Sequence, residues 1–164
     1  MRTNMNIDIN NSMYAIKAMD LFKEGYNCAQ SVFLAFEDKY DCGHDFALKL
    51  SSSFGGGMGR LREVCGAVSG MFMVAGVLYG YASPTDQEGK KEHYERIQQL
   101  ANEFRQMTGS IVCRELLGVG AGADAPTPEK RTAEYYQKRP CVQMVGIAAA
   151  IMQQYITEKS EKME

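Results

Sequence analysis

The chain has 164 residues, with 18 Lys and Arg against 20 Asp and Glu, two His, five Cys and no Trp. Its net charge of −2 excludes the basic surface expected of a nucleic-acid-binding protein, and two histidines exclude a histidine-rich metal site. The length suits one domain, residues 1–164, with a hydrophobic core that needs no disulfides to stabilise it.

The N-terminal segment is polar. Its first ten residues lack the apolar stretch of a secretory signal, so we expect a cytoplasmic protein whose cysteines stay mostly reduced. Helical periodicity then begins with an apolar stripe that Gly25 ends. The stripe consists of Ala15, Ala18, Met19, Phe22 and Tyr26.

A second helix begins after Asn27, which is placed to cap it together with Gln30 in a capping box. Its apolar stripe consists of Ala29, Val32, Phe33, Phe36 and Tyr40. A shorter helix is predicted over residues 45–52, and a flexible glycine-rich stretch follows over residues 51–59.

The next segment is apolar and begins near Val64. Residues 64–82 carry no charge over 19 residues and contain two Gly-x-x-x-Gly pairs, which approaches the pattern of a membrane-spanning helix. Four glycines lower its hydropathy, and the chain has no second segment of this kind. We therefore interpret it as the central, fully surrounded helix of a bundle and expect no membrane span.

A break at residues 83–86 precedes a long amphipathic helix that Gly109 ends. Its charged first half, residues 88–96, is interpreted as a solvated face without functional weight. Its inward positions are Tyr94, Ile97, Leu100, Ala101, Phe104 and Met107. Ser110 is placed to cap a short helix that contains residues 113–117.

The C-terminal part begins with a loop over residues 119–126. Thr127 and Pro128 then have the pattern of a helix start, and Pro140 ends that segment and opens the last helix. The last helix places Val142, Val145, Ala149, Met152 and Ile156 inward. The sequence thus predicts an all-α fold, a single-domain helical bundle around the central apolar, glycine-containing helix.

The five cysteines divide by their places on these elements. Cys28, Cys65, Cys113 and Cys141 each fall at or near a predicted helix start, whereas Cys42 falls in a loop. Unpaired N–H groups and the helix dipole stabilise a thiolate at a helix start, and the thiolate is the reactive and metal-binding form of cysteine. We therefore predict lowered pKa values for these four thiols and a shared site, although a cysteine also serves as a small buried apolar residue.

Cations lie close to three of the four cysteines in the sequence. Arg60 and Arg62 precede Cys65, Arg114 follows Cys113, and Lys138 and Arg139 precede Cys141. Cys42 has no such support and is interpreted as incidental, with a partial metal site shared with His44 as the alternative.

A glycine-rich turn, Gly55, Gly56, Gly57 and Gly59, lies just before Cys65. It lacks the Lys and Ser/Thr of a P-loop and the third glycine of a dinucleotide fingerprint, so we expect it to allow close backbone approach beside the site. The chain contains no Cys-x-x-Cys pair, so tertiary folding must assemble any shared site.

Taken in order, the chain contains Gly25-Tyr-Asn-Cys28-Ala-Gln-Ser-Val32, Phe54-Gly-Gly-Gly-Met-Gly59, Glu63-Val-Cys65-Gly-Ala-Val-Ser-Gly70, Cys113-Arg-Glu-Leu-Leu117 and Cys141. This set resembles the C_GCAxxG_C_C family of redox-active proteins, from about Gly25 to the last helix. The Gly-Cys order of the family label is not matched literally, because this chain reads Cys-Gly-Ala from Cys65. The resemblance implies the same four cysteines as the family positions and leaves Cys42 outside. Similar modules beside cytochrome domains imply an iron–sulfur or other metal centre as an alternative chemistry.

Three hypotheses follow. In the first, the chain is a thiol redox protein that acts on a redox partner or a small thiol, with Cys28 and Cys65 as the preferred reactive pair. In the second, the four cysteines hold zinc or an iron–sulfur cluster. In the third, the chain is a non-catalytic helical assembly module with packed cysteines. So apolar a helical domain also suits a homodimer, although no residue identifies an interface.

Overall fold

The computed structural model describes residues 7–120 and 122–164. The expectation that no secretory signal is present falls largely on residues 1–6, which lie outside the described residues. Helices form the regular structure of the described part, which contains no strand and only one isolated antiparallel bridge, between Val64 and Val112. The predicted all-α class is confirmed.

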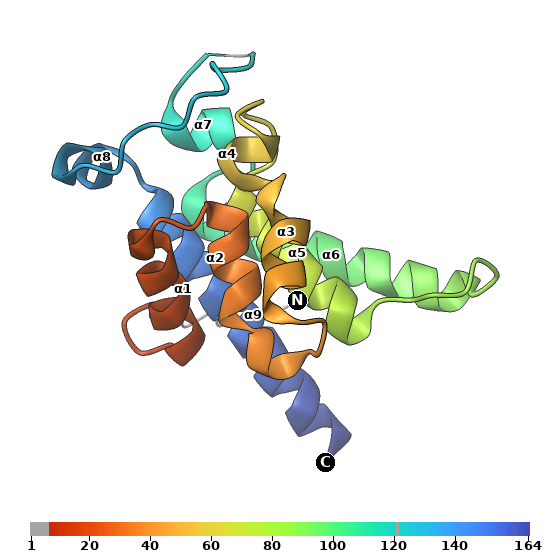
Figure 1. Ribbon diagram of the computed structural model, residues 1–164. Helices are drawn as coiled ribbons and strands as arrows, with labels where there is room; N and C mark the ends of the chain where they lie inside the picture. Colours follow the sequence, from red (N-terminus) through yellow and green to blue (C-terminus); the bar gives the residue numbers. More distant parts are fainter. Residues whose placement is uncertain (1–6, 121) are drawn as a thin grey trace.

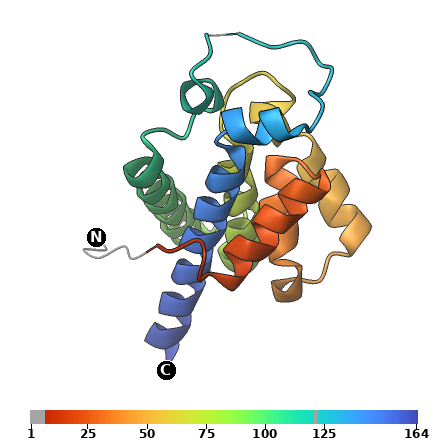
Figure 2. The same ribbon diagram turned by 90° about the vertical axis from the view of Figure 1, so that its left-hand side faces the viewer.

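The helices follow one another closely along the chain. They are α1 Met13–Glu24, α2 Cys28–Ala35, the 3-10 helix η1 Glu37–Lys39, α3 His44–Ser52, α4 Gly55–Met58, α5 Gly66–Tyr79, α6 Gln87–Thr108, α7 Cys113–Leu117, α8 Ala133–Lys138 and α9 Cys141–Met163. Figure 1 shows α1, α2, α5 and α9 together in the body, with α4, α7 and α8 at the top and α6 projecting to the right. Figure 2 shows α9 running through the body to the C-terminus at the bottom.

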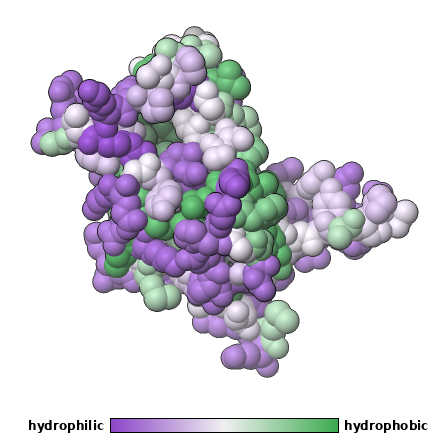
Figure 3. Space-filling model, viewed as in Figure 1, coloured by the Kyte–Doolittle hydropathy of each residue, from purple (hydrophilic) through white to green (hydrophobic). Residues whose placement is uncertain are grey.

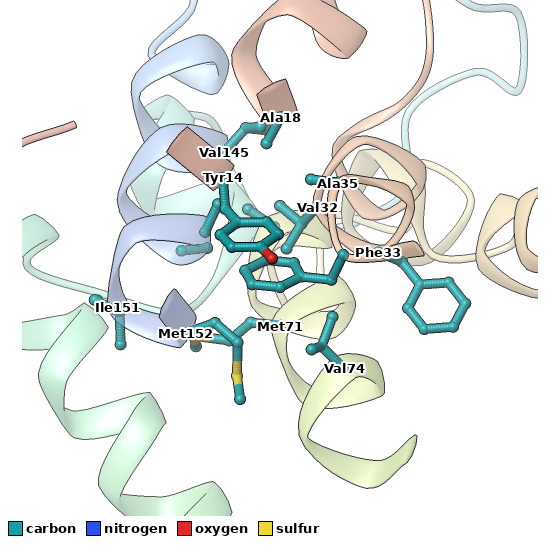
Figure 4. Packing of buried hydrophobic residues seen from close by; sticks show 14 of the residues in the cluster. Tyr14, Ala18, Val32, Phe33, Ala35, Met71, Val74, Val145, Ile151 and Met152 are labelled. Carbon is teal, nitrogen blue, oxygen red and sulfur yellow. The ribbon is translucent and has the colours of Figure 1, made fainter. Parts of the chain in front are cut away.

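The hydrophobic core lies where α1, α2, α5 and α9 pack against one another. Figure 4 shows side chains of all four helices meeting there, among them Tyr14, Val32, Met71 and Met152. The close packing of α5 on α2 depends on Gly70, where a Cβ atom would lie 2.7 Å from the carbonyl oxygen of Ala29. Residues 66–71, 74 and 75 of the apolar segment are buried as predicted, but Val77 near the end of α5 is 49% exposed, so the helix is not surrounded along its whole length.

The predicted beginnings and ends of the first two helices are confirmed. Gly25 ends α1 in the left-handed conformation, and Asn27 and Gln30 form the capping box of α2. The predicted stripes run too far, because Tyr26 and Tyr40 lie outside both helices. None of the helices in the described residues is both long and apolar enough to cross a membrane.

The long helix α6 corrects the prediction of its inward face. Leu100 and Phe104 are buried, but Tyr94 is 51% exposed and Met107 is 39% exposed. Tyr94 is exposed because the first half of α6 projects from the body (Figure 1), whereas Met107 lies in the last turn of the helix. Arg96, which we placed on a solvated face, is instead 6% exposed and donates from Nε to the hydroxyl of Tyr155 over 2.8 Å.

The start of α8 was also predicted wrongly. Thr127 and Pro128 lie outside any helix, and Thr132 caps α8 by accepting from the backbone N–H of Tyr135 at 3.1 Å. A threonine caps a helix when its side-chain oxygen can accept from the backbone N–H group of a residue two or three positions later. A proline after the threonine does not by itself create this arrangement. Hydrophilic residues cover α8 at the upper left of Figure 3, while hydrophobic surface gathers near α3, where Phe46 and Leu50 are exposed.

Candidate functional site

A cavity of about 280 Å³ lies at the end of the bundle where four helices begin, near α4 and α7 at the top of Figure 1. Its lining includes the four cysteines that the sequence analysis selected: Cys28, Cys65, Cys113 and Cys141. Cys28, Cys113 and Cys141 are the first residues of α2, α7 and α9, and Cys65 is the residue before α5. The fold therefore brings together cysteines that are far apart in the sequence.

The side chains of Cys28 and Cys141 interact directly with each other. Asn27 fixes the start of α2 by accepting from the N–H of Gln30 at 2.9 Å and donating to the carbonyl of Ser52 at 3.1 Å. Pro140 precedes α9 and sets the position of Cys141. Both side chains line the cavity, and a hydrogen bond from the Cys28 thiol to Cys141 is the main cause of the shifts in the pKa values of the two groups.

Cys65 and Cys113 are held by the isolated bridge. The N–H of Cys65 donates to the carbonyl of Ile111 at 2.8 Å, and the N–H of Cys113 donates to the carbonyl of Glu63 at 2.6 Å. Both cysteines flank the bridged pair, so the alternation of an extended chain places their side chains on one face of the bridge. Both are buried, whereas Cys28 and Cys141 are half-buried.

The glycine-rich turn makes this close approach possible. Gly57 has a φ of +68°, and a Cβ atom there would lie 2.6 Å from the Cβ of Cys113. At Gly66, a Cβ atom would lie 3.0 Å from the Cβ of Cys28 and 2.9 Å from the carbonyl oxygen of Phe54. The turn thus packs against Cys113, while the glycine after Cys65 makes room for Cys28.

Cys141 has the lowest pKa of the four thiols. The hydrogen bond from Cys28 lowers the pKa of Cys141 from 9.0 to about 7, and the charges of Arg139 and Arg131 act in the same direction against the effect of burial. The same hydrogen bond, together with burial, raises the pKa of Cys28 well above its ordinary value. The pair is therefore asymmetric, with a thiolate at Cys141 and a thiol at Cys28.

Cys65 and Cys113, like Cys28, contradict the prediction that a helix start lowers the pKa of all four thiols. Burial raises the pKa of Cys65 to about 12. Burial also raises the pKa of Cys113, although Nη1 of Arg62 lies 3.7 Å from its sulfur and opposes the shift. At these two positions the cost of burying a charge exceeds the stabilisation that the helix start supplies. At Cys28, burial and the hydrogen bond to Cys141 both raise the pKa.

The cations near the cysteines are only partly those that the sequence indicated. Arg62 contacts Cys113 rather than Cys65, and its Nε donates to Asp124 at 2.7 Å. Arg60 and Arg139 line the cavity. Lys138 and Arg114 are absent from its lining: Lys138 pairs with Glu134, and Arg114 with Glu63.

Sequence reasoning missed Arg131 and Tyr135, which both line the cavity. Arg131 donates to the carbonyl oxygens of Phe22 at 2.9 Å and Tyr26 at 3.1 Å, and Tyr135 hydrogen-bonds to Cys141. Arg131 stands more than 100 positions from its carbonyl partners, so no local pattern marks it. Recognising Thr132 as the helix cap would have placed Tyr135 on α8, close to Cys141.

Cys42 lies outside the cavity lining, and His44 pairs through Nδ1 with Glu37 at 2.9 Å. Across residues 7–120 and 122–164, no group of three or more His, Cys, Asp or Glu side chains is arranged to hold a metal ion. The described side chains therefore form no ready-made ligand set for a single metal ion, either at the four cysteines or at Cys42 and His44.

Of the comparisons with known proteins, one finds a match. The profile of one protein family, described as "Putative redox-active protein (C_GCAxxG_C_C)", matches residues 26–155. No curated protein and no solved structure gives a significant match.

Proposed function

Since the chain belongs to the C_GCAxxG_C_C family of redox-active proteins, we propose that it carries out thiol–disulfide exchange, with Cys141 as the attacking thiolate and Cys28 as the resolving thiol. The observation that carries this proposal is that these two cysteines line one cavity and interact there, which shifts their pKa values in opposite directions. Both are half-buried, so a small disulfide that enters the cavity can reach them.

The exchange has two steps. The thiolate of Cys141 attacks one sulfur of a disulfide R–S–S–R, which forms a mixed disulfide and releases one thiolate RS⁻. Cys28 then loses its proton and attacks the sulfur of Cys141, which closes the Cys28–Cys141 disulfide and releases the second RS⁻. The protein loses two electrons and the substrate gains them, and the reverse sequence reduces the protein.

We assign each group a part in these steps. Arg139 and Arg131 stabilise the thiolate of Cys141, and Tyr135 supports it with a hydrogen bond. We assign Cys65 and Cys113 to the wall of the site, because burial keeps both thiols protonated. This pairing differs from the Cys28–Cys65 pair preferred from the sequence, since the hydrogen bond joins Cys28 to Cys141. Free thiols persist in a reducing compartment, which supports a cytoplasmic location for the protein.

The experiment uses protein purified anaerobically and treated with bis(2-hydroxyethyl) disulfide, a neutral disulfide. Thiol counting and peptide mass spectrometry should show the loss of two thiols and one disulfide that joins Cys28 to Cys141. Cys141→Ser should lose this reaction, and Cys28→Ser should stop at the mixed disulfide on Cys141. Cys42→Ser is the matched control, since Cys42 lies outside the cavity lining, and it should react like the unchanged protein.

The same sample separates the other hypotheses. Metal analysis and an absorption spectrum should show neither bound zinc nor an iron–sulfur cluster, and a stoichiometric metal that protects the four cysteines would overturn the proposal. A constant thiol count with all four substitutions affecting only stability would instead support a non-catalytic assembly module.

A further inference from the structure

The cavity that contains the cysteines carries more positive than negative charge. Four arginines line it: Arg60, Arg62, Arg131 and Arg139. The carboxylates that face them are Glu129, which pairs with Arg139 and lies 4.0 Å from Arg60, and Asp124, which pairs with Arg62. Two carboxylates against four guanidinium groups leave two positive charges, of which a thiolate at Cys141 balances one.

Among the four arginines of the cavity, Arg131 is the one that has no acidic partner in the described residues. Its hydrogen bonds go to two carbonyl oxygens at the end of α1, and it lies over the rings of Phe22, at 4.0 Å, and Tyr135, at 5.1 Å. In the described part of the chain, no carboxylate forms an ion pair with it. These contacts hold the group in the cavity wall while its charge remains unbalanced.

Arg62 supplies a second, independent indication of a ligand. The residue is 4% exposed, and its Nε and Nη1 contact Asp124 and Cys113. Its Nη2 is buried and has no hydrogen-bond partner in the described residues. A buried charged donor without an acceptor is costly, so an acceptor supplied by a bound molecule would relieve that cost.

We propose that the cavity binds a small disulfide or thiol that carries a carboxylate, with Arg131 and Arg62 as the residues that bind the carboxylate. This substrate class rests on the thiol exchange proposed above. A cavity of about 280 Å³ accommodates a small molecule, and the fork of donors on arginine suits a carboxylate. The anion would place its disulfide beside Cys141, which shares the cavity wall with both arginines.

The alternative is that the arginines only stabilise the thiolate of Cys141. The two roles differ in one measurable respect. A group that acts on the thiolate alone changes the reaction with every disulfide by the same factor. A group that binds the substrate changes the ratio between anionic and neutral disulfides.

The experiment measures the oxidation rate of the reduced full chain by three disulfides of similar size. They are 3,3′-dithiodipropionate, which is anionic, bis(2-hydroxyethyl) disulfide, which is neutral, and cystamine, which is cationic. Each rate is divided by that of the same disulfide with free 2-mercaptoethanol, which removes differences in intrinsic reactivity. We expect the anionic disulfide to exceed the neutral one by about tenfold at low salt, with cystamine slowest and the differences shrinking as salt rises.

Variants test whether the preference for the anionic disulfide arises in the cavity. Arg131→Gln should lower the anionic-to-neutral ratio several-fold, and Arg131→Lys should restore part of it. Arg105→Gln removes the same charge from the exposed surface of α6, outside the cavity lining, and should leave the ratio unchanged. The series on the unchanged protein is decisive even if Arg131→Gln does not fold.

Two failures are distinguishable. If the neutral disulfide oxidises Cys28 and Cys141 but the three normalised rates are equal, the carboxylate-binding proposal is wrong and the exchange stands. An Arg131→Gln variant that slows all three disulfides by one common factor leads to the same conclusion. If none of the three disulfides changes the thiol count, the proposed exchange itself is wrong.

Discussion

The two ends of the helical body are built in different ways. The core end consists of helices α1, α2, α5 and α9, whose apolar side chains pack against one another (Figure 4). The cavity end is formed by helix starts and by residues 53–65, 110–120 and 122–140, where side chains contact polar groups far away in the sequence. Arg62, for example, contacts Asp124, and Arg131 contacts the end of α1.

This difference separates stability from chemistry. Apolar burial in the core supplies most of the free energy of folding, because each fully buried large side chain contributes about 1.5–3 kcal/mol. The cavity end depends on a few hydrogen bonds and ion pairs and on the positive φ angles of the glycine-rich turn. These features place the cysteines and arginines within reach of one another. We therefore expect core substitutions to change stability and cavity substitutions to change reactivity.

The largest effect is expected from a large-to-small change in the core. Phe36 is fully buried and stacks on Tyr14 with ring centroids 4.3 Å apart, at the opposite end of α2 from Cys28. Phe36→Ala should lower the free energy of unfolding by roughly 4 kcal/mol, measured by urea denaturation. The folded fraction should still form the Cys28–Cys141 disulfide. Loss of that reaction in folded protein would show that the two ends are coupled.

A pair of glycine substitutions tests the cavity end against a helix interior. Gly57 has a φ of +68°, and a Cβ atom there would lie 2.9 Å from the Cα of Arg62 as well as 2.6 Å from the Cβ of Cys113. Gly57→Ala should therefore cost roughly 3 kcal/mol through backbone strain and crowding. Gly76 in α5 has open space where a Cβ would stand, so Gly76→Ala should stabilise the protein by about 1 kcal/mol.

Thermal unfolding of both variants measures this contrast. The Gly57→Ala variant should also react more slowly with bis(2-hydroxyethyl) disulfide, because the turn packs against the cavity wall. Equal melting temperatures for the two variants would show that the turn adapts to a side chain and does not fix the position of Cys113.

The pH dependence tests the asymmetry between the cavity thiols. In a Cys42→Ser background, alkylation of Cys141 by iodoacetamide should increase as the pH rises through about 7, where its thiolate forms, whereas Cys65, with a pKa of about 12, should stay unreactive. Arg139→Gln removes a charge that favours the thiolate, so the midpoint should move to higher pH. Lys138→Gln is the matched control. Lys138 pairs with Glu134 outside the cavity lining, so its loss should leave the midpoint in place.

Mass spectrometry of the alkylated peptides follows each thiol separately. The groups that face Cys141 are Cys28, Tyr135, Arg131 and Arg139. A midpoint near the ordinary value of 9.0 in the unchanged protein would show that these groups do not stabilise the thiolate, and Cys141 would then lose its role as the attacking group.

The sequence predicted the core end well because its signals are local. The Asn27–Gln30 capping box and Gly25 lie within a few residues of the helix ends that they determine, and the apolar stripe of α1 repeats at the helical period. The same reasoning selected the four cysteines that line the cavity, although Val112 rather than the predicted Ser110 is the N-cap of α7. It could not pair them, because the Cys28–Cys141 contact depends on how α2 and α9 pack.

The electrostatics of the site could not be read from the sequence either. Nearness along the chain indicated Lys138 and Arg114, but the fold turns both toward carboxylates outside the cavity lining and brings Arg131 in. Burial, which a sequence does not display, decides that Cys65 keeps its proton. Long-range packing therefore determines which of the residues indicated by the sequence take part in the chemistry of the site.

The smallest expected effect tests the helix start that the sequence misplaced. Thr132 accepts from the N–H of Tyr135 at 3.1 Å, so Thr132→Ala should cost about 1 kcal/mol, the usual contribution of such a cap. Thr127 is exposed and lies outside every helix of the described residues, so Thr127→Ala should change stability by less than about 0.5 kcal/mol. Urea denaturation of the two variants measures the difference. Because α8 carries Tyr135 to Cys141, Thr132→Ala should also slow the alkylation of Cys141 slightly at pH 7, and equal behaviour of the two variants would mean that α8 does not position Tyr135.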